Sequence, residues 1–229
     1  MERKIITTAD GSTTIHLTEW NEHYHSKHGA IQEAYHVFIK NGLDYICHPE
    51  LVSESPPTTA ILEIGFGTGL NAFITLLEAE RNKVDIDYVG VEAYPVSMEE
   101  VKQLNYPQQL HEEGKAFLFE ELHNLSWEDK HQISENFWLT KQQRFFSEIA
   151  DQNKYNIIYF DAFGARVQPE LWSEDIFKIM YNALKPNGIL VTYAAKGSVR
   201  RAMLSVGFKV EKLPGPPGKR EMLRAQKST

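Results

Sequence analysis

A glycine-rich stretch that follows an apolar run constrains the fold of this chain more than any other feature. The run Ala60–Ile64 leads into Gly65-Phe66-Gly67-Thr68-Gly69, and Leu70-Asn71-Ala72-Phe73 then begins a helical pattern. A strand that turns sharply into a helix needs glycine where φ is positive or where a ligand lies against the backbone. Three glycines in five residues are more than a turn alone requires, so this loop is predicted to bind a ligand. The G-x-G-x-G spacing differs from the G-x-G-x-x-G of dinucleotide-binding folds and disfavours a nucleotide-dependent oxidoreductase.

The rest of the chain alternates apolar runs with amphipathic segments. Strands are predicted at 4–8, 13–17, 59–64, 86–91, 137–140, 155–160, 189–193, 208–213 and 221–225. Helices are predicted at 30–40, 96–104, 144–151, 173–184 and 197–206, with further helical turns within 105–135. This alternation implies an α/β fold with a mostly parallel sheet and helices on both faces. The last two strands are joined by residues 214–219 without a helix, so the last strand is predicted to run antiparallel.

Residues 1–57 are predicted to form a hairpin and helix extension packed on a core domain of residues 58–229. The signal for the hairpin is Asp10-Gly11 between two runs of β-branched residues. The following helix is expected to end at Asn41-Gly42, and Pro56-Pro57 to separate the extension from the core.

Acidic residues follow two of the predicted strands directly, namely Glu92 and Asp161. In open α/β sheets, ligands bind across the carboxyl ends of the central strands, where the glycine loop also lies. Glu92 stands 23 residues beyond Gly69. A carboxylate in that place can accept both hydroxyl protons of a ribose diol. The sequence therefore predicts a binding site formed by the glycine loop, Glu92 and Asp161.

The segment Glu63–Asn71 is similar to motif I of the class I S-adenosylmethionine-dependent methyltransferases. The resemblance implies a Rossmann-like sheet and S-adenosyl-L-methionine as the cofactor. Asp161 would then face the sulfonium methyl group. Methyl transfer is an in-line displacement, so catalysis rests on positioning and on removal of a proton from an amine nucleophile. Asp161 is therefore the candidate catalytic residue.

Four blocks of sequence narrow the resemblance. They are Glu63–Asn71, Glu33–Phe38, Asp161-Ala162-Phe163-Gly164 with Pro169-Glu170-Leu171-Trp172, and Gly215–Leu223. Together they resemble the methyltransferase part of the MnmC family, the enzymes of tRNA 5-methylaminomethyl-2-thiouridine biosynthesis, from about Tyr24 to the C-terminus. The resemblance implies a tRNA-modifying enzyme that methylates the 5-aminomethyl group of 5-aminomethyl-2-thiouridine at the wobble position.

The same resemblance assigns roles to individual residues. Cofactor contacts are implied for Glu63, Gly65, Gly67, Gly69, Asn71, Glu92, Gln143 and Asp161. Gln142-Gln143 stand where the family often has an acid that contacts the adenine amine, and a glutamine carbonyl can accept the same hydrogen bond. Lys219 and Arg220, in a loop of the fourth block, are implied to contact RNA or to close the site.

Two further expectations concern partners. The sequence ends at Thr229, without the FAD-dependent oxidase domain of the bifunctional family members, so a separate enzyme is expected to supply the aminomethyl substrate. The net charge is −7, yet residues 185–229 carry ten basic and only two acidic residues. Such asymmetry is consistent with a polyanion such as tRNA on the basic side, although a solvated, charge-balanced surface explains it equally well.

Composition excludes several other classes. No run approaches the roughly 18 to 20 apolar residues of a membrane span, and the N-terminus lacks a signal-peptide hydrophobic region. The expected location is the cytoplasm, without a membrane partner. Cys47 is the single cysteine, which excludes an intrachain disulfide. The histidines at 16, 23, 25 and 28 lack a carboxylate in helical register, so no metal site is expected.

Two alternatives to the tRNA assignment stay open at this point. One is a methyltransferase that acts on a small-molecule or protein amine, which the acidic charge of the first 184 residues favours. The other is a non-catalytic S-adenosylmethionine-binding module, which the glycine loop, Glu92 and Asp161 argue against.

Overall fold

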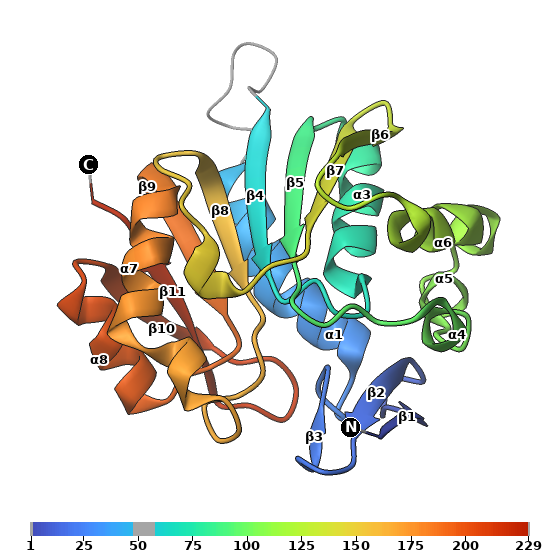
Figure 1. Ribbon diagram of the computed structural model, residues 1–229, viewed down its shortest axis with the longest axis horizontal. Coiled ribbons are helices and arrows are strands. Elements are labelled where there is room, and N and C mark those ends of the chain that lie inside the picture. Colours follow the sequence, from blue (N-terminus) through green and yellow to red (C-terminus); the bar gives the residue numbers. More distant parts are fainter. Residues whose placement is uncertain (1, 48–57, 229) are drawn as a thin grey trace.

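The centre of the fold is one mixed sheet (Figure 1). The computed structural model describes residues 2–47 and 58–228, and over this part of the chain the sheet has the strand order β10-β11-β9-β8-β4-β5-β7-β6. The strands are β4 (Thr59–Ile64), β5 (Ile86–Val91), β6 (Lys130–Ser134), β7 (Phe137–Gln142), β8 (Tyr155–Phe160), β9 (Leu184–Thr192), β10 (Lys209–Pro214) and β11 (Glu221–Gln226).

Five neighbouring strands, β7, β5, β4, β8 and β9, run parallel. Strand β11 pairs antiparallel with both β9 and β10, which confirms the prediction for the last strand. Strand β6, which pairs antiparallel with β7 at the opposite edge, was not predicted. Its side chains are half-buried or exposed and its sequence is largely polar, so it lacks the apolar pattern of a central strand.

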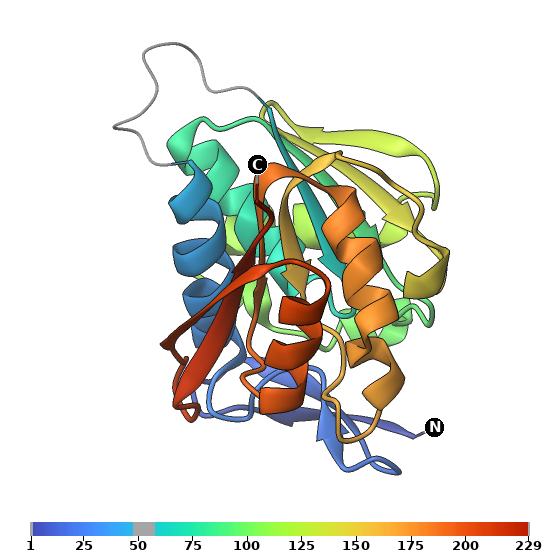
Figure 2. The ribbon, with the colours of Figure 1, turned by 90° about the vertical axis from the view of Figure 1, so that its left-hand side faces the viewer.

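Helices cover both faces of the sheet (Figure 2). One face packs against α1 (Ala30–Ala34), the π-helix η1 (Tyr35–Leu43), α3 (Leu70–Asn82) and α6 (Ala116–Asn124). The other face packs against α7 (Glu174–Ala183) and α8 (Gly197–Ser205). The residues of β4 alternate accordingly, because Ile61 joins the first core and Leu62 the second. The three-layer α/β prediction is confirmed.

The shorter helical turns are α2 (Asp44–Ile46), α4 (Met98–Val101), α5 (Tyr106–Gln109) and the 3-10 turns η3 (Glu113–Lys115), η4 (Phe146–Glu148) and η5 (Pro169–Trp172). Two helix predictions were wrong in extent. The predicted helix 96–104 is reduced to α4, which begins after the N-cap Ser97 in a capping box with Glu100. The predicted helix 144–151 is only the turn η4, because Phe145 and Ile149 on either side of it are extended.

The predicted helix end at Asn41-Gly42 is also wrong. Helical structure continues through η1 and α2 to Ile46. Gly42 is buried against the sheet, where an added Cβ would lie 3.2 Å from both Tyr159 and Val191. Glycine here allows a close approach of the helix to the sheet rather than a helix end.

The N-terminal residues form a small sheet of β1 (Arg3–Thr7), β2 (Thr13–Leu17) and β3 (Glu22–His23), which confirms the predicted hairpin. In Figure 1 this sheet lies beyond the carboxyl ends of the parallel strands. Arg3 donates to the backbone oxygen of Tyr94, and Asn105 donates to that of Gly11. The predicted Pro56-Pro57 linker lies outside the described residues, and the boundary between residues 57 and 58 stays a prediction. No helix in the described part of the chain is long and apolar enough to cross a membrane.

Candidate active site

The five parallel strands end in one row, and the residue after each strand lies at the same edge of the sheet. The register pairs Ile64 with Val91 and with Phe160, and Val91 with Gln142. The residues that follow the strand ends are Gly65, Glu92, Gln143, Asp161 and Tyr193. Four of these five residues belonged to the sequence prediction; Tyr193 did not.

The glycine loop turns sharply between β4 and α3. Gly65, Gly67 and Gly69 have φ angles of 91°, 48° and 71°, a region that other residues rarely adopt. A Cβ on Gly65 would lie 2.8 Å from the backbone oxygen of Asp161. The loop therefore needs glycine for its backbone conformation, and at Gly65 also for its close packing against the strand end that carries Asp161.

Two cavities open at this edge, and Asp161 lines both. The glycine-loop cavity has a volume of about 950 Å³ and includes Gly65, Gly67, Asn71 and Glu92 in its lining. The carboxylate cavity has a volume of about 890 Å³ and is lined by Glu33, Tyr193, Lys219 and Arg220, among others. Tyr24, His25, Ala162 and Phe163 are also shared, so the two cavities meet around Asp161.

Backbone donors hold Glu92 in the lining of the glycine-loop cavity. Its Oε2 accepts a hydrogen bond from the Gly67 backbone N–H at 3.0 Å, and its Oε1 accepts one from Tyr94 at 2.9 Å. Tyr94 and Phe145 form an exposed edge-to-face pair at the rim of this cavity, with ring centroids 6.1 Å apart. The cavity thus combines a fixed carboxylate with exposed aromatic surface.

Asn71 connects the glycine loop to the acids behind and beside it. Its Nδ2 donates to Glu63 Oε1 and to Asp161 Oδ2, each at 2.9 Å. Its Oδ1 is buried and has no hydrogen-bond partner among the described residues. Glu63 is fully buried, and burial raises its pKa well above the usual value. Glu63 lines neither cavity, and Asn71, which lines the glycine-loop cavity, lies between Glu63 and that cavity.

The pKa of the Asp161 carboxyl group lies close to neutral pH. Burial raises its pKa to about 7, and the nearby Glu33 carboxylate acts in the same direction. The hydrogen bond from Asn71 and the positive charge of Lys219 oppose this shift. A carboxyl group with a pKa near the ambient pH can both accept and return a proton.

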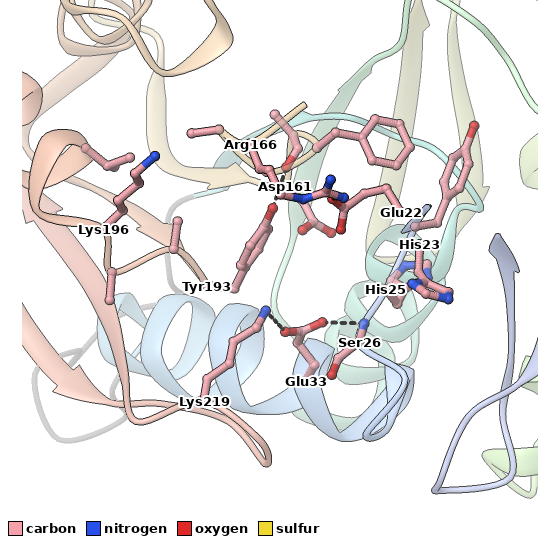
Figure 3. Close-up of a pocket in the computed structure, with 18 of the residues that line it drawn as sticks. Glu22, His23, His25, Ser26, Glu33, Asp161, Arg166, Tyr193, Lys196 and Lys219 are labelled. Carbon is pink, nitrogen blue, oxygen red and sulfur yellow. Dashed lines mark hydrogen bonds and ion pairs between the residues drawn. The ribbon is translucent and has the colours of Figure 1, made fainter. Parts of the chain in front are cut away.

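Charged side chains from distant parts of the chain meet in the carboxylate cavity (Figure 3). Glu33 accepts a hydrogen bond from the Ser26 backbone N–H at 2.8 Å and forms an ion pair with Lys219. The Lys219 ammonium also lies 3.8 Å from the centroid of the Tyr193 ring. Glu33 belongs to one of the sequence blocks that resemble the family, but the sequence predicts neither Glu33 nor Tyr193 as a site residue. Glu33 is 6 % exposed in the structure. The one sequence signal that could have indicated it is a charged residue within an amphipathic helix.

The remaining predicted site residues lie farther out. Gln143 is exposed, and its backbone N–H donates to Glu128; it lines neither cavity. Gly69 is the N-cap of α3 and is also outside both linings. Arg220 is exposed at the mouth of the carboxylate cavity, whereas the Lys219 ammonium points inward.

The N-terminal segment closes the site from the side opposite to the sheet. Trp20 and Tyr24 make edge-to-face contacts with Phe163, in the loop after β8. Arg166 in the same loop donates to the backbone oxygens of Trp20 and Asn21 and pairs with Glu22 at 2.7 Å. The segment around residues 20–25 is therefore part of the wall of both cavities.

The N-terminal histidines serve other contacts. His16 and His23 stack with ring centroids 4.5 Å apart, and the partly buried His25 lies within hydrogen-bond distance of Thr14 and Thr68. Burial lowers the pKa of His25 to about 4, so it is neutral at pH 7. Over residues 2–47 and 58–228, no group of three or more histidine, cysteine, aspartate or glutamate side chains is placed to hold a metal ion.

The chain is similar to a known family and to several known proteins. The model of a family described as S-adenosyl-L-methionine-dependent methyltransferase matches residues 105–228. The tRNA 5-methylaminomethyl-2-thiouridine biosynthesis bifunctional protein MnmC of Hydrogenovibrio crunogenus is 28% identical over 216 residues, which cover 90% of this chain and 31% of that protein. An uncharacterised protein of Methanocaldococcus jannaschii is 26% identical over 230 residues, covering 99% of this chain and 60% of that protein. The chain thus spans about a third of the length of the MnmC relative.

Solved structures share the fold. The crystal structure of MNMC2 from Aquifex aeolicus superposes with a TM-score of 0.76 at 23% identity, covering 100% of this chain and 71% of that one. Spermidine synthase from Thermotoga maritima gives a TM-score of 0.55 at 14% identity, covering 99% of this chain and 68% of that one. At these identities the likeness concerns the fold alone.

Proposed function

The chain belongs to a family of S-adenosyl-L-methionine-dependent methyltransferases, and from this premise we propose that it methylates the 5-aminomethyl group of 5-aminomethyl-2-thiouridine at the wobble position of tRNA. The observation that carries the proposal is the place of Asp161, which lines both cavities. A methyl donor in one cavity and an amine in the other would meet at this carboxyl group. The name of the MnmC relatives supports tRNA as the carrier of that amine.

The residues of the glycine-loop cavity fit S-adenosylmethionine on chemical grounds. Asn71 Oδ1 is a buried acceptor without a partner among the described residues, and it suits the ammonium group of an amino acid. The two oxygens of Glu92 each keep a lone pair for a ribose hydroxyl, and Tyr94 with Phe145 offers aromatic surface to a flat base. When bound there, S-adenosylmethionine would supply an electrophilic methyl group.

Asp161 is proposed as the catalytic residue because it can remove the proton that blocks an amine. A primary amine arrives mainly as an ammonium ion, whose nitrogen has no free lone pair. Since Asp161 Oδ2 accepts from Asn71, we expect Oδ1 to take the proton. The transfer leaves a neutral amine and a neutral carboxyl group, and the raised pKa of Asp161, about 7, suits both forms. The aromatic wall of Trp20, Tyr24 and Phe163 would limit the access of water.

Cations at the mouth of the carboxylate cavity support an anionic substrate. Lys27, Lys196 and Arg220 are exposed and line this cavity. Exposed cations attract the phosphates of RNA and release counterions on binding. A tRNA substrate would also place the reaction in the cytoplasm, and we propose that a separate enzyme supplies the aminomethyl-uridine.

The test is an assay with methyl-labelled S-adenosylmethionine and tRNA from cells that cannot complete the wobble modification. Nucleoside mass analysis should show the methylaminomethyl product with the wild-type protein and at least about a hundredfold slower formation of it with Asp161→Asn. Product formed at the same rate by both proteins would contradict the role of Asp161. Cofactor binding without any tRNA product would favour an amine carried by a small molecule or a protein.

A further inference from the structure

The ammonium group of Lys219 lies within the carboxylate cavity. It forms the ion pair with Glu33 and stands 3.8 Å from the centroid of the Tyr193 ring (Figure 3). The ring is fixed in turn, because Tyr193 Oη donates to the backbone oxygen of Ala162 at 2.8 Å. A carboxylate and an aromatic face together form a favourable environment for a cation.

Glu33 is a buried and oriented carboxylate. Its side chain is 8% exposed, and the Ser26 backbone N–H holds its second oxygen. A buried carboxylate needs a counter-charge, since the cost of burying it unpaired is high. Asp161 lines the same cavity, and the positive charge of Lys219 acts on the Asp161 carboxyl group as well as on Glu33.

Lys219 is suited to leave this position. Its side chain is 31% exposed and ends in an ammonium on a flexible four-carbon stem. The backbone that carries it is held more firmly. The Lys219 N–H donates to the Pro216 oxygen at 2.9 Å, and the adjacent Gly218, with a φ of 83°, packs directly against His28. The side chain can therefore turn outward to the mouth while the loop stays in place.

We propose that Glu33 and the Tyr193 ring form a cation subsite beside Asp161, that the ammonium group of the substrate binds in it, and that Lys219 fills it in the substrate-free protein. The exchange replaces one ammonium by another, so the charge of the cavity is conserved and no covalent bond changes. The displaced Lys219 then reaches the mouth, where it can contact an anionic part of the substrate. The inference rests on the proposed function only in taking the substrate to be an amine.

The test uses benzylammonium, a ring that carries an aminomethyl group as the proposed base does. Calorimetric titration should show that Lys219→Met binds benzylammonium at least threefold more tightly than the wild type, because the internal competitor is gone. Benzyl alcohol, which lacks the charge, should bind both proteins equally. Adding Glu33→Gln to Lys219→Met should remove the gain. An equal or weaker affinity of Lys219→Met for benzylammonium would overturn the proposal.

A matched control separates this role from a structural one. Lys130→Met also breaks a lysine ion pair, with Asp87 at 2.9 Å, but outside both cavities, and it should leave benzylammonium binding unchanged. If the Glu33–Lys219 pair only stabilised the fold, Lys219→Met would lower the melting temperature without distinguishing benzylammonium from benzyl alcohol. That result would also overturn the proposal.

The outcome is independent of the tRNA assay. Methylation of tRNA together with an unchanged benzylammonium affinity in Lys219→Met would retain the proposed function and reject the cation subsite. A gain in benzylammonium affinity without tRNA methylation would retain the cation subsite and reject tRNA as the substrate.

Discussion

The two cavities that meet at Asp161 are built in different ways. The glycine-loop cavity takes Gly65, Gly67 and Glu92 from loops that follow neighbouring parallel strands, and backbone N–H groups orient its carboxylate. The carboxylate cavity takes Glu33 from α1 and Lys219 from the loop between β10 and β11, 186 positions apart in the sequence. The backbone conformation of the loops shapes the first cavity. An ion pair between side chains that are distant in the sequence shapes the second.

Because of this difference, we expect the two cavities to respond differently to substitution. Changes in the glycine loop should disturb the fold and cofactor affinity together, since the backbone itself forms the site. Changes in the carboxylate cavity should alter turnover and substrate affinity while the fold persists. Asp161 lines both cavities. A substitution of Asp161 is therefore the strictest test of whether cofactor affinity and turnover can change separately.

The largest effect is expected from Asp161→Asn. Loss of a general base at this position should reduce methyl transfer by about 10²- to 10⁴-fold. Affinity for S-adenosylmethionine should stay within about tenfold, because the amide can keep a hydrogen bond with Asn71. Single-turnover kinetics and calorimetry on the same preparation measure the two quantities. If Asp161→Asn lost methyl transfer and S-adenosylmethionine affinity to the same extent, the two cavities would not act separately.

Gly65→Ala should have the next largest effect, on stability. The positive φ and the contact with the Asp161 backbone oxygen predict a loss of about 1–3 kcal/mol in the free energy of unfolding. Gly114→Ala is the matched control, because an added Cβ there meets no atom within 4 Å. Urea denaturation compares the two variants. Equal stability would mean that the loop relaxes more easily than its contacts indicate.

The pH dependence should follow the ionisation of Asp161. With a pKa of about 7, its ionised fraction falls about tenfold per unit at lower pH, and kcat/KM should fall with it. An acid with a raised pKa stabilises the fold at low pH, and this contribution is lost as the pH rises from about 4 to about 7. The stability of the wild type relative to Asp161→Asn should therefore decline over this interval.

The groups that act on the ionisation of Asp161 come from several elements: Asn71 of α3, Glu33 of α1 and Lys219 of the β10–β11 loop. Urea midpoints measured at several pH values test the expectation. A constant difference between the wild type and Asp161→Asn from pH 4 to pH 8 would contradict the raised pKa.

The smallest effect is expected at the mouth of the carboxylate cavity. Arg220→Gln should weaken tRNA binding modestly and reduce the slope of log K against log salt by about one. Cofactor affinity should not change, because Arg220 lines only the carboxylate cavity. Filter binding over a range of salt concentrations measures the slope. An unchanged slope would assign the RNA surface elsewhere.

The parallel core of the fold could be predicted from the sequence because its strands are buried on both faces. The apolar runs at 59–64, 86–91 and 155–160 correspond to β4, β5 and β8 with the same bounds. Local sequence patterns did not predict the structure where contacts between distant elements determine it. Gly42 continues a helix because it packs on the sheet, and the polar strand β6 forms by pairing at an edge.

The candidate site divides in the same way. Gly65, Glu92 and Asp161 could be placed from the sequence because each directly follows a strand. Tyr193 also follows a strand, but no local pattern distinguishes it from other tyrosines. The partnership of Glu33 with Lys219 depends on contacts between the two ends of the chain, which no local pattern encodes.

The antiparallel pairing of β11 has a consequence for the order in which the protein is completed during synthesis. Since β10 runs toward the edge that carries both cavities and β11 runs away from it, the loop with Lys219 reaches the site only when this last pair has docked. The ribosome delivers the glycine loop, Glu92 and Asp161 earlier than this loop. Contacts of such long sequence separation form slowly. We therefore expect the ion pair of Glu33 with Lys219 to be among the last contacts of the site to form.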